Sequence, residues 1–240
     1  MQTKNLPPHE AGMVEEPHPK QDFQVERIAF FSDAVFAIAI TLLIIEFHPP
    51  HVTKDSTSAE VWHEVVGMKF KFIALVLSFV LVVVYWSRHH FLFKHIHNYN
   101  RAIIGANMAL LLPIIFFPFT TSFLYESLGS NIQAVSIPYR LFMLNNVLAS
   151  AFTGWFYWLI IKKYPACSYP MKKDEESDFF YKILLSVISF SLVFIISFFS
   201  FELSPWGILP FAVYQLYRRN KQKFKKKPVA HVKQSGSAGH

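Results

Sequence analysis

The chain has 240 residues, of which 52% are hydrophobic and 16% are charged. Soluble domains usually carry about a quarter charged residues, and the apolar residues here form long runs, so the composition favours a membrane protein. The single cysteine, Cys167, excludes an internal disulfide and a multi-cysteine metal site. The net charge of +7 would suit nucleic-acid binding in a soluble protein. Because the basic residues stand at the ends of apolar runs, we expect no nucleic-acid partner.

Six apolar segments follow one another along the chain. The first five reach or approach the ~20 residues that a helix needs to cross ~30 Å of hydrocarbon, whereas the sixth has only thirteen residues. The third contains Pro113 and Pro118, which predict a kink. The sequence therefore predicts an all-α, polytopic membrane protein with six transmembrane helices, at Arg27–Phe47, Lys71–Ser87, Ile103–Leu124, Leu141–Ile161, Phe179–Phe201 and Pro205–Tyr217.

The basic residues predict how these helices are oriented. With a cytoplasmic N-terminus, nineteen of the 23 Lys and Arg residues lie on the inner side and only Lys54, Lys69, Lys71 and Arg140 lie on the outer side. Cytoplasmic loops carry the excess of positive charge, so both termini are expected in the cytoplasm. We further expect three regions, the last of them anchored at anionic lipid headgroups: a flexible cytoplasmic leader, a six-helix transmembrane domain and a basic cytoplasmic tail, at 1–26, 27–217 and 218–240.

Polar side chains gather where the first three predicted helices meet the inner membrane boundary. Such residues are costly at membrane depth and are candidates for a site. Because successive helices alternate in direction, we expect these residues to meet. The favoured interpretation is a hydrogen-bonded anchor between helices, and a proton relay or a ligand site is the alternative. The residues are Arg27, Ser32 and Asp33 of the first helix, Trp86, Arg88, His89 and His90 of the second, and Asn107 of the third.

The rest of the first helix has an aliphatic front. At 100° per residue, Ile38, Thr41, Leu42 and Ile45 form one stripe about 100° wide, and Asp33 lies roughly opposite. Either this stripe has a function of its own, or it faces lipid and Thr41 donates to its own backbone at position i−4. The residues by themselves leave both possibilities open.

A family resemblance emerges from these residues. The segment "RIAFFSD" fits the pattern R-x-x-x-F-S-D and resembles the endosomal and lysosomal potassium channel family, transmembrane protein 175. The resemblance continues through "AVFAIAITLLIIEF" and includes "YWSRHHFLF" in the second helix. With six predicted helices, the chain is similar to a bacterial member. It departs from the pattern at Ile38, where members vary between aliphatic residues.

The resemblance implies a homotetramer in which the first helix of each subunit lines a central pore. It implies a constriction at Ile38, Leu42 and Ile45, with Thr41 as the selectivity layer. It also implies that the motif residues pack and hydrogen-bond toward the second and third helices. That anchoring network comprises Arg27, Phe31, Ser32, Asp33, Trp86, His89, His90 and Asn107.

We therefore expect a potassium-permeable cation channel in the bacterial cell membrane, with membrane lipid and monovalent cations as its partners and no cofactor. The alternative is a proton-coupled transporter or a proton-permeable pathway that uses Asp33 and the histidines His89 and His90. A membrane-embedded enzyme is disfavoured, because no nucleophile, base and metal set assembles in the sequence. Recordings in potassium against sodium separate the channel from the transporter.

Overall fold

The computed structural model describes residues 19–50, 52–128 and 131–225 of the chain. This part of the chain is helical, with one isolated β-bridge between Ile96 and Ser168. The elements are α1 (Pro19–Ile45), α2 (Ser58–Gly67), α3 (Lys69–Phe93), α4 (Arg101–Ser127), α5 (Ile132–Trp158), the π-helical segment η1 (Leu159–Lys163), the 3₁₀ segment η2 (Pro165–Cys167), α6 (Lys173–Phe199), the 3₁₀ segment η3 (Ser204–Ile208) and α7 (Leu209–Lys225).

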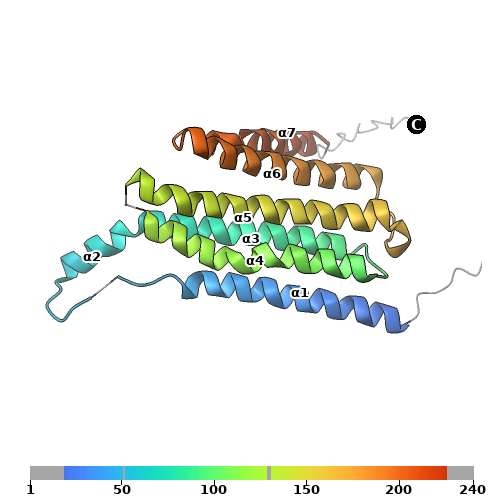
Figure 1. Ribbon diagram of the computed structural model, residues 1–240, viewed down its shortest axis with the longest axis horizontal. Coiled ribbons are helices and arrows are strands. Elements are labelled where there is room, and N and C mark those ends of the chain that lie inside the picture. The colour runs from blue at the N-terminus through green and yellow to red at the C-terminus, as the bar shows by residue number, and fades with distance from the viewer. Residues whose placement is uncertain (1–18, 51, 129–130, 226–240) are drawn as a thin grey trace, which may run out of the picture.

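Five of these helices are long and apolar enough to cross a membrane: α1 from Gln24 onward, α3, α4, α5 with η1, and α6. They lie side by side, with α1 on one flank and α6 and α7 on the opposite flank (Figure 1). The prediction of an all-α polytopic fold is confirmed. The sixth predicted span falls on η3 and α7, and its crossing of the membrane stays a prediction.

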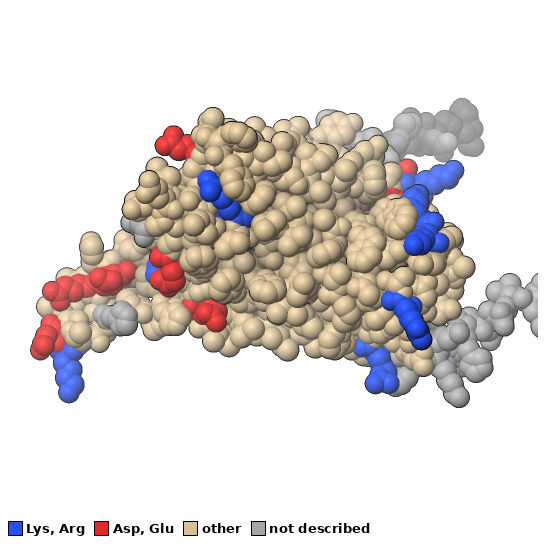
Figure 2. Space-filling model, in the orientation of Figure 1, with Lys and Arg blue, Asp and Glu red and all other residues tan. Residues whose placement is uncertain are grey.

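Following the predicted topology, we call the end where α3 ends and α4 begins the inner end, and the opposite end the outer end. Figure 2 shows most of the visible Lys and Arg side chains at the inner end and most of the visible Asp and Glu side chains at the outer end. An uncharged band separates them. This band is what a protein surrounded by hydrocarbon presents, because charge is excluded from the bilayer core.

The helices are longer than the apolar runs that predicted them. Helix α5 begins at Ile132, well before Leu141, because the Asn131 side chain accepts a hydrogen bond of 2.9 Å from the Ala134 amide and caps the helix. Residues 132–140, which lie between the third and fourth predicted helices, are thus helical. Helix α4 continues through Pro113 and Pro118.

The predicted domain boundaries also fall inside helices. Helix α1 begins at Pro19, before the boundary at residue 26, and α7 continues to Lys225, past the boundary at residue 217. The remainder of the predicted leader, residues 1–18, and of the predicted tail, residues 226–240, lies outside the described residues.

Helix α2 at the outer end was not predicted, because its ten residues are too few to span a membrane. Its start is a capping box: the Thr57 amide donates to the Glu60 carboxylate at 2.8 Å, and the Glu60 amide donates to the Thr57 hydroxyl at 3.3 Å. The hydrogen bonds from Thr57, with that from its backbone the strongest, hold the pKa of Glu60 below its usual value.

Helices α3, α4 and α5 form the centre of the bundle, and α1 packs against α3 and α4. Large side chains fill this centre, including Tyr85 of α3, Phe117 of α4 and Phe156 of α5, all fully buried. From α1, Phe36 and Leu43 enter the same core. One side of α1 is therefore fixed to the bundle by apolar packing.

Gly207 lets η3 pass close to α6, which leads to a packing prediction. A Cβ atom at Gly207 would lie 2.7 Å from the backbone nitrogen of Val193, whereas one at Gly105 in α4 would meet nothing within 4 Å in the described structure. We expect Gly207→Ala to lower the thermal unfolding midpoint in detergent. Gly105→Ala should leave it unchanged or raise it, since Ala is favoured over Gly in a helix by about 0.5–1 kcal/mol. Equal midpoints for the two variants would show that η3 does not pack in this way.

Candidate pore helix and its anchoring network

Helix α1 has two faces that differ in burial. The face toward the bundle carries Ser32, Phe36, Ala39 and Leu43, which are all buried. The opposite face is exposed in the single chain and begins at Arg27 at the inner end. Along it follow Phe30, Phe31, Ala34, Ala37, Ile38, Thr41, Ile44 and Ile45.

The predicted stripe lies on the exposed face. Ile38 is 57% exposed and Ile45 is 67% exposed, and Thr41 lies between them on the same side. Leu42 is only partly exposed and sits at the edge of this face. The stripe is thus free to face lipid or other copies of the chain, and Leu42 reaches it from the side.

The Thr41 hydroxyl donates to the backbone carbonyl of Ile38 at 2.9 Å, which is position i−3. The lipid-facing interpretation predicted a bond at i−4. A hydroxyl has one donor and two acceptor lone pairs, so the bond to Ile38 occupies the donor. The oxygen keeps its lone pairs on the exposed face. An oxygen lone pair is what coordinates a cation.

A directional chain of hydrogen bonds joins α3, α4 and α1 on the buried side. His89 Nε2 lies 2.8 Å from Asn107 Oδ1, and Asn107 Nδ2 donates to Ser32 Oγ at 2.9 Å. Ser32 Oγ in turn donates to the carbonyl of Ile28 at 2.9 Å. Since the Asn107 oxygen only accepts, the Nε2 atom of His89 carries the proton in this arrangement. One asparagine therefore connects three helices.

His89 is enclosed by aromatic rings. It is 1% exposed, and its ring centroid lies 5.4 Å from Phe36, 4.5 Å from Phe93 and 6.0 Å from Phe156. Its Nδ1 atom is buried and has no hydrogen-bond partner among the described residues. With Nε2–H donating to Asn107, Nδ1 is the lone-pair nitrogen of the neutral ring. This surrounding suits a neutral structural histidine.

A second contact fixes Asp33. The indole Nε1–H of Trp86 donates to Asp33 Oδ1 at 2.9 Å, and the His90 ring stacks on Trp86 with a centroid distance of 5.4 Å. Trp86 is 36% exposed, so this group lies at the surface between α1 and α3. Asp33 is thereby held away from the stripe around Ile38.

Arg27 and Phe31 lie elsewhere. Both are on the exposed face of α1, and Phe31 is 53% exposed. With Tyr99 and Met108 they line a shallow cavity of about 320 Å³. The expectation that they pack toward the second-helix residues of the network does not hold within one protomer. The reason is geometric, because positions 27 and 31 are four apart and share a face, whereas Ser32 is turned 100° away from Phe31.

Sequence reasoning missed a second polar layer deeper in the bundle. The hydroxyl of Tyr85 donates to the backbone carbonyl of Asn146 at 3.1 Å and lies 2.9 Å from Ser150 Oγ. Between α4 and α3, Thr121 Oγ1 donates to Ser78 Oγ at 2.9 Å. Asn146 and Ser150 stand four residues apart in an apolar helix, and this spacing is a signal from which the layer could have been predicted.

Comparison with known proteins adds a sequence relationship to this geometry. Residues 27–118 match the family described as endosomal/lysosomal potassium channel TMEM175. A potassium channel of Streptomyces collinus is 31% identical over 131 residues, which cover 54% of this chain and 62% of that protein. The endosomal/lysosomal proton channel TMEM175 of Danio rerio is 34% identical over 89 residues, which cover 35% of this chain and 17% of that protein. The chain thus spans less than two thirds of the length of these relatives.

A solved structure shares the fold. The crystal structure of a lysosomal potassium-selective channel TMEM175 homolog from Chamaesiphon minutus superposes with a TM-score of 0.65 at 24% identity, covering 82% of this chain and 99% of that one. The fold and its apolar helices define an all-helical, multi-pass membrane protein. Residues 27–118 match the model of the TMEM175 family, so the predicted resemblance to that family is confirmed over this part of the chain.

Proposed function

We propose that the chain is a potassium-permeable cation channel and that it forms a homotetramer whose central pore is lined by α1. The observation that carries this proposal is the two-sided character of α1. One side is locked to the bundle by Ser32, Asp33 and Phe36, and the other presents Thr41 within an aliphatic stripe to the outside of the protomer. Relatives named as potassium channels support it.

The position of α1 in the bundle suits such an assembly. It occupies one flank, and α6 and α7 occupy the opposite flank (Figure 1). Four copies related by a central axis can therefore bring their α1 helices together while α6 and α7 face the lipid. A closed ring of identical subunits is the usual symmetry of a homo-oligomer, and it would surround the axis with four copies of each side chain in the stripe.

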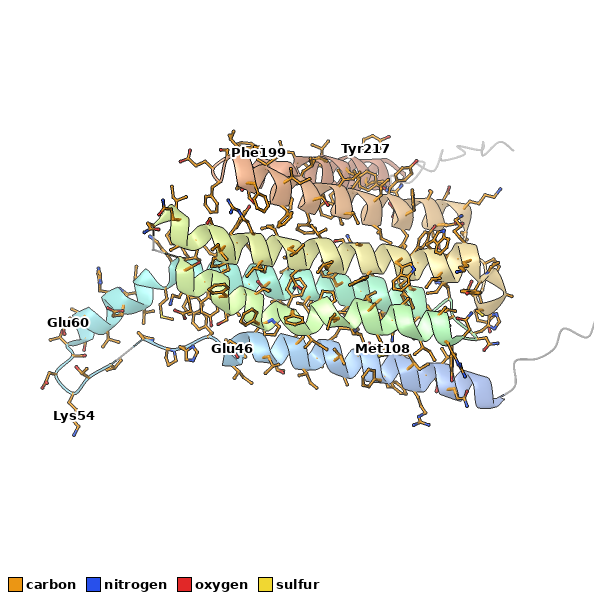
Figure 3. The ribbon with its side chains drawn as sticks, viewed as in Figure 1. Glu46, Lys54, Glu60, Met108, Phe199 and Tyr217 are labelled. Atoms are coloured by element: carbon orange, nitrogen blue, oxygen red, sulfur yellow. The ribbon has the colours of Figure 1, made fainter. Side chains whose placement is uncertain are left out.

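On this proposal Ile38, Leu42 and Ile45 form hydrophobic rings. A narrow ring of aliphatic side chains excludes water and so blocks ions, and it conducts when it is wide enough to stay wet. The Thr41 oxygens form a ring between these layers and can replace part of the water around a potassium ion. Glu46 follows at the outer end, and the chain leads from it to Lys54 and Glu60 beyond the bundle (Figure 3).

The outer end of α1 is also tied to the bundle. The Tyr125 hydroxyl of α4 donates to the backbone carbonyl of Glu46, and Phe47 packs against the rings of Phe72 and Tyr125 at centroid distances of 4.6 and 5.7 Å. The helix is thus held at both ends, which keeps its stripe at a fixed position. The Glu46 carboxylate near the proposed pore mouth would raise the local cation concentration.

The proposal is tested by recording from the purified protein in liposomes under a bi-ionic gradient of potassium against sodium. A channel gives a reversal potential that shifts toward the Nernst potential of potassium. Current that needs a coupled proton gradient would contradict the channel. Conduction by a protein that stays monomeric would contradict the homotetramer.

Thr41→Val tests the proposed selectivity layer. Valine keeps the shape of threonine and removes the hydroxyl, so size is constant and only the chemistry changes. We expect assembly to be preserved and the discrimination of potassium over sodium to fall, measured as the change in reversal potential under the same bi-ionic gradient. Thr53→Val, in the outer loop, is the matched control. An unchanged reversal potential in Thr41→Val would remove Thr41 from the selectivity layer.

The alternative is a proton pathway, which the name of the zebrafish relative favours. In the structure the Asp33 carboxylate accepts a hydrogen bond from the indole of Trp86. The indole is a hydrogen-bond donor only, so it cannot accept a proton from a relay. His89 belongs to a separate chain that ends on the carbonyl of Ile28. These contacts hold helices together and form no continuous relay. A recording under a pH gradient at equal potassium concentrations decides between a potassium channel and a proton pathway. In a proton pathway the pH gradient would set the reversal potential.

A further inference from the structure

A cavity of about 400 Å³ opens at the inner end of the molecule, away from α1, where α3, α6 and α7 meet. Its apolar wall is made by Val84, Phe91 and Phe179. Its charged lining residues are Arg88, Glu175, Asp178 and Lys182. Neither the stripe of α1 nor the network around Asn107 reaches it. The cavity therefore needs an explanation separate from ion conduction.

Arg88 is the unusual group in this cavity. Its side chain is on a membrane-spanning helix and the residue is only 8% exposed, yet the guanidinium makes one described hydrogen bond, from Nη2 to Ser186 Oγ at 2.8 Å. It also lies over the ring of Tyr85, 5.8 Å from the centroid. A guanidinium has five N–H donors, and no carboxylate of the described residues lies within ion-pair distance of it. A buried charge without a partner is costly.

One of the two carboxylates that line the cavity, Asp178, is already paired with other residues. Asp178 accepts from Lys182 at 2.8 Å and from the Tyr214 hydroxyl at 3.0 Å, and it forms an ion pair with Arg218. Its single negative charge is shared between two cations. Glu175, the second carboxylate of the lining, is exposed to solvent. Arg88 is therefore a buried cation of the cavity that is paired with no carboxylate among the described residues.

We propose that this cavity binds a phosphate group, with Arg88 as its principal ligand. Guanidinium groups bind phosphate oxygens through paired N–H donors, and basic pockets between membrane helices on the cytoplasmic side suit anionic lipid headgroups. The apolar wall of Val84, Phe91 and Phe179 would accommodate the acyl chains of a lipid. A soluble phosphate compound from the cytoplasm has the same headgroup chemistry, so the two sources need separate tests. The proposal does not depend on the channel function.

The experiment measures the thermal unfolding midpoint of the full chain in detergent micelles. One arm adds phosphatidylglycerol against phosphatidylcholine as its zwitterionic control, and a second adds inorganic phosphate against sulfate-free chloride at equal ionic strength. Wild type is compared with Arg88→Gln and with Arg101→Gln, which removes an exposed cation at the same end. We expect the anionic ligand to raise the midpoint of wild type and Arg101→Gln. In Arg88→Gln the apparent affinity should fall about tenfold or more, because hydrogen bonds to charged groups contribute ~1.5–3 kcal/mol.

A second variant keeps the test decisive if Arg88→Gln fails to fold. Ser87 is exposed and lines the cavity, so Ser87→Phe fills the cavity while leaving the Arg88–Ser186 contact in place. It should abolish the response as Arg88→Gln does. A midpoint raised only by phosphatidylglycerol identifies the ligand as a lipid headgroup. A midpoint raised by inorganic phosphate identifies it as a soluble phosphate compound. Equal responses in wild type and both cavity variants, or no response in either arm, would overturn the proposal.

Discussion

Shortening one hydrophobic ring of the proposed pore, as in Ile38→Ala or Leu42→Ala, is expected to increase potassium current several-fold. Each substitution removes aliphatic volume from every subunit at one level of the pore, so water persists there and ions can cross. The measurement is the conductance of reconstituted protein under a fixed potassium gradient, with the amount of assembled protein determined for each variant.

The structure ranks these substitutions. Ile38 and Ile45 point outward from the middle of the exposed face, whereas Leu42 lies at its edge, so Ile38→Ala should have the larger effect. Ile195→Ala, on the exposed side of α6, is a control that removes aliphatic volume from the flank opposite to α1. If truncation at 38, 42 and 45 leaves conductance unchanged, the stripe of α1 faces lipid and the pore lies elsewhere.

Replacing Asn107 by leucine is expected to cause the largest loss of stability among the variants considered. The substitution keeps a side chain of similar size but strands the Nε2–H of the buried His89 and removes a partner of Ser32. An unsatisfied buried donor costs about 1–3 kcal/mol. The thermal unfolding midpoint in detergent and the yield of assembled protein should both fall.

A double substitution separates this cost from a general packing defect. When both partners become apolar, the penalty of a stranded donor disappears, so His89→Phe combined with Asn107→Leu should recover part of the stability lost in Asn107→Leu. Met108→Leu, next in the chain but 40% exposed, is the control and should change little. A double variant that is no more stable than Asn107→Leu would argue against the hydrogen-bonded role of Asn107.

The helices of the bundle could be predicted from hydrophobicity, and their ends could not. Apolar runs locate α1, α3, α4 and α6 because burial in lipid or in the core requires them. The start of α5 at Ile132 escaped prediction, because Gln133, Ser136 and Arg140 interrupt the apolar residues of its first turns and the Asn131 cap sets the boundary. Helix α2 escaped because it is too short to be read as a membrane span, although "TSAE" has the spacing of a capping box.

Part of the candidate site also followed from spacing alone. The helical period places Ser32 toward the bundle and Ile38 away from it, and the alternation of helix direction brings Asn107 and His89 to the same depth. The direction of Arg88 was not predicted. It stands next to His89 in the sequence but is turned 100° around the helix, so it faces α6 while His89 faces α4. Which neighbouring helix occupies each side of α3 depends on the tertiary packing.

The residues of the seven-residue motif lie on two faces of α1. The motif therefore bears on two equilibria, the folding of the protomer and the association of protomers. Ser32 and Asp33 contact residues of their own protomer, so their contribution is independent of protein concentration. Arg27 and Phe31 are exposed in the single chain, and any contact they make with another copy follows the law of mass action. On dilution in detergent, variants of Arg27 or Phe31 should lose assembly at higher protein concentrations than wild type does. Variants of Ser32 or Asp33 should instead unfold with a midpoint that dilution leaves unchanged.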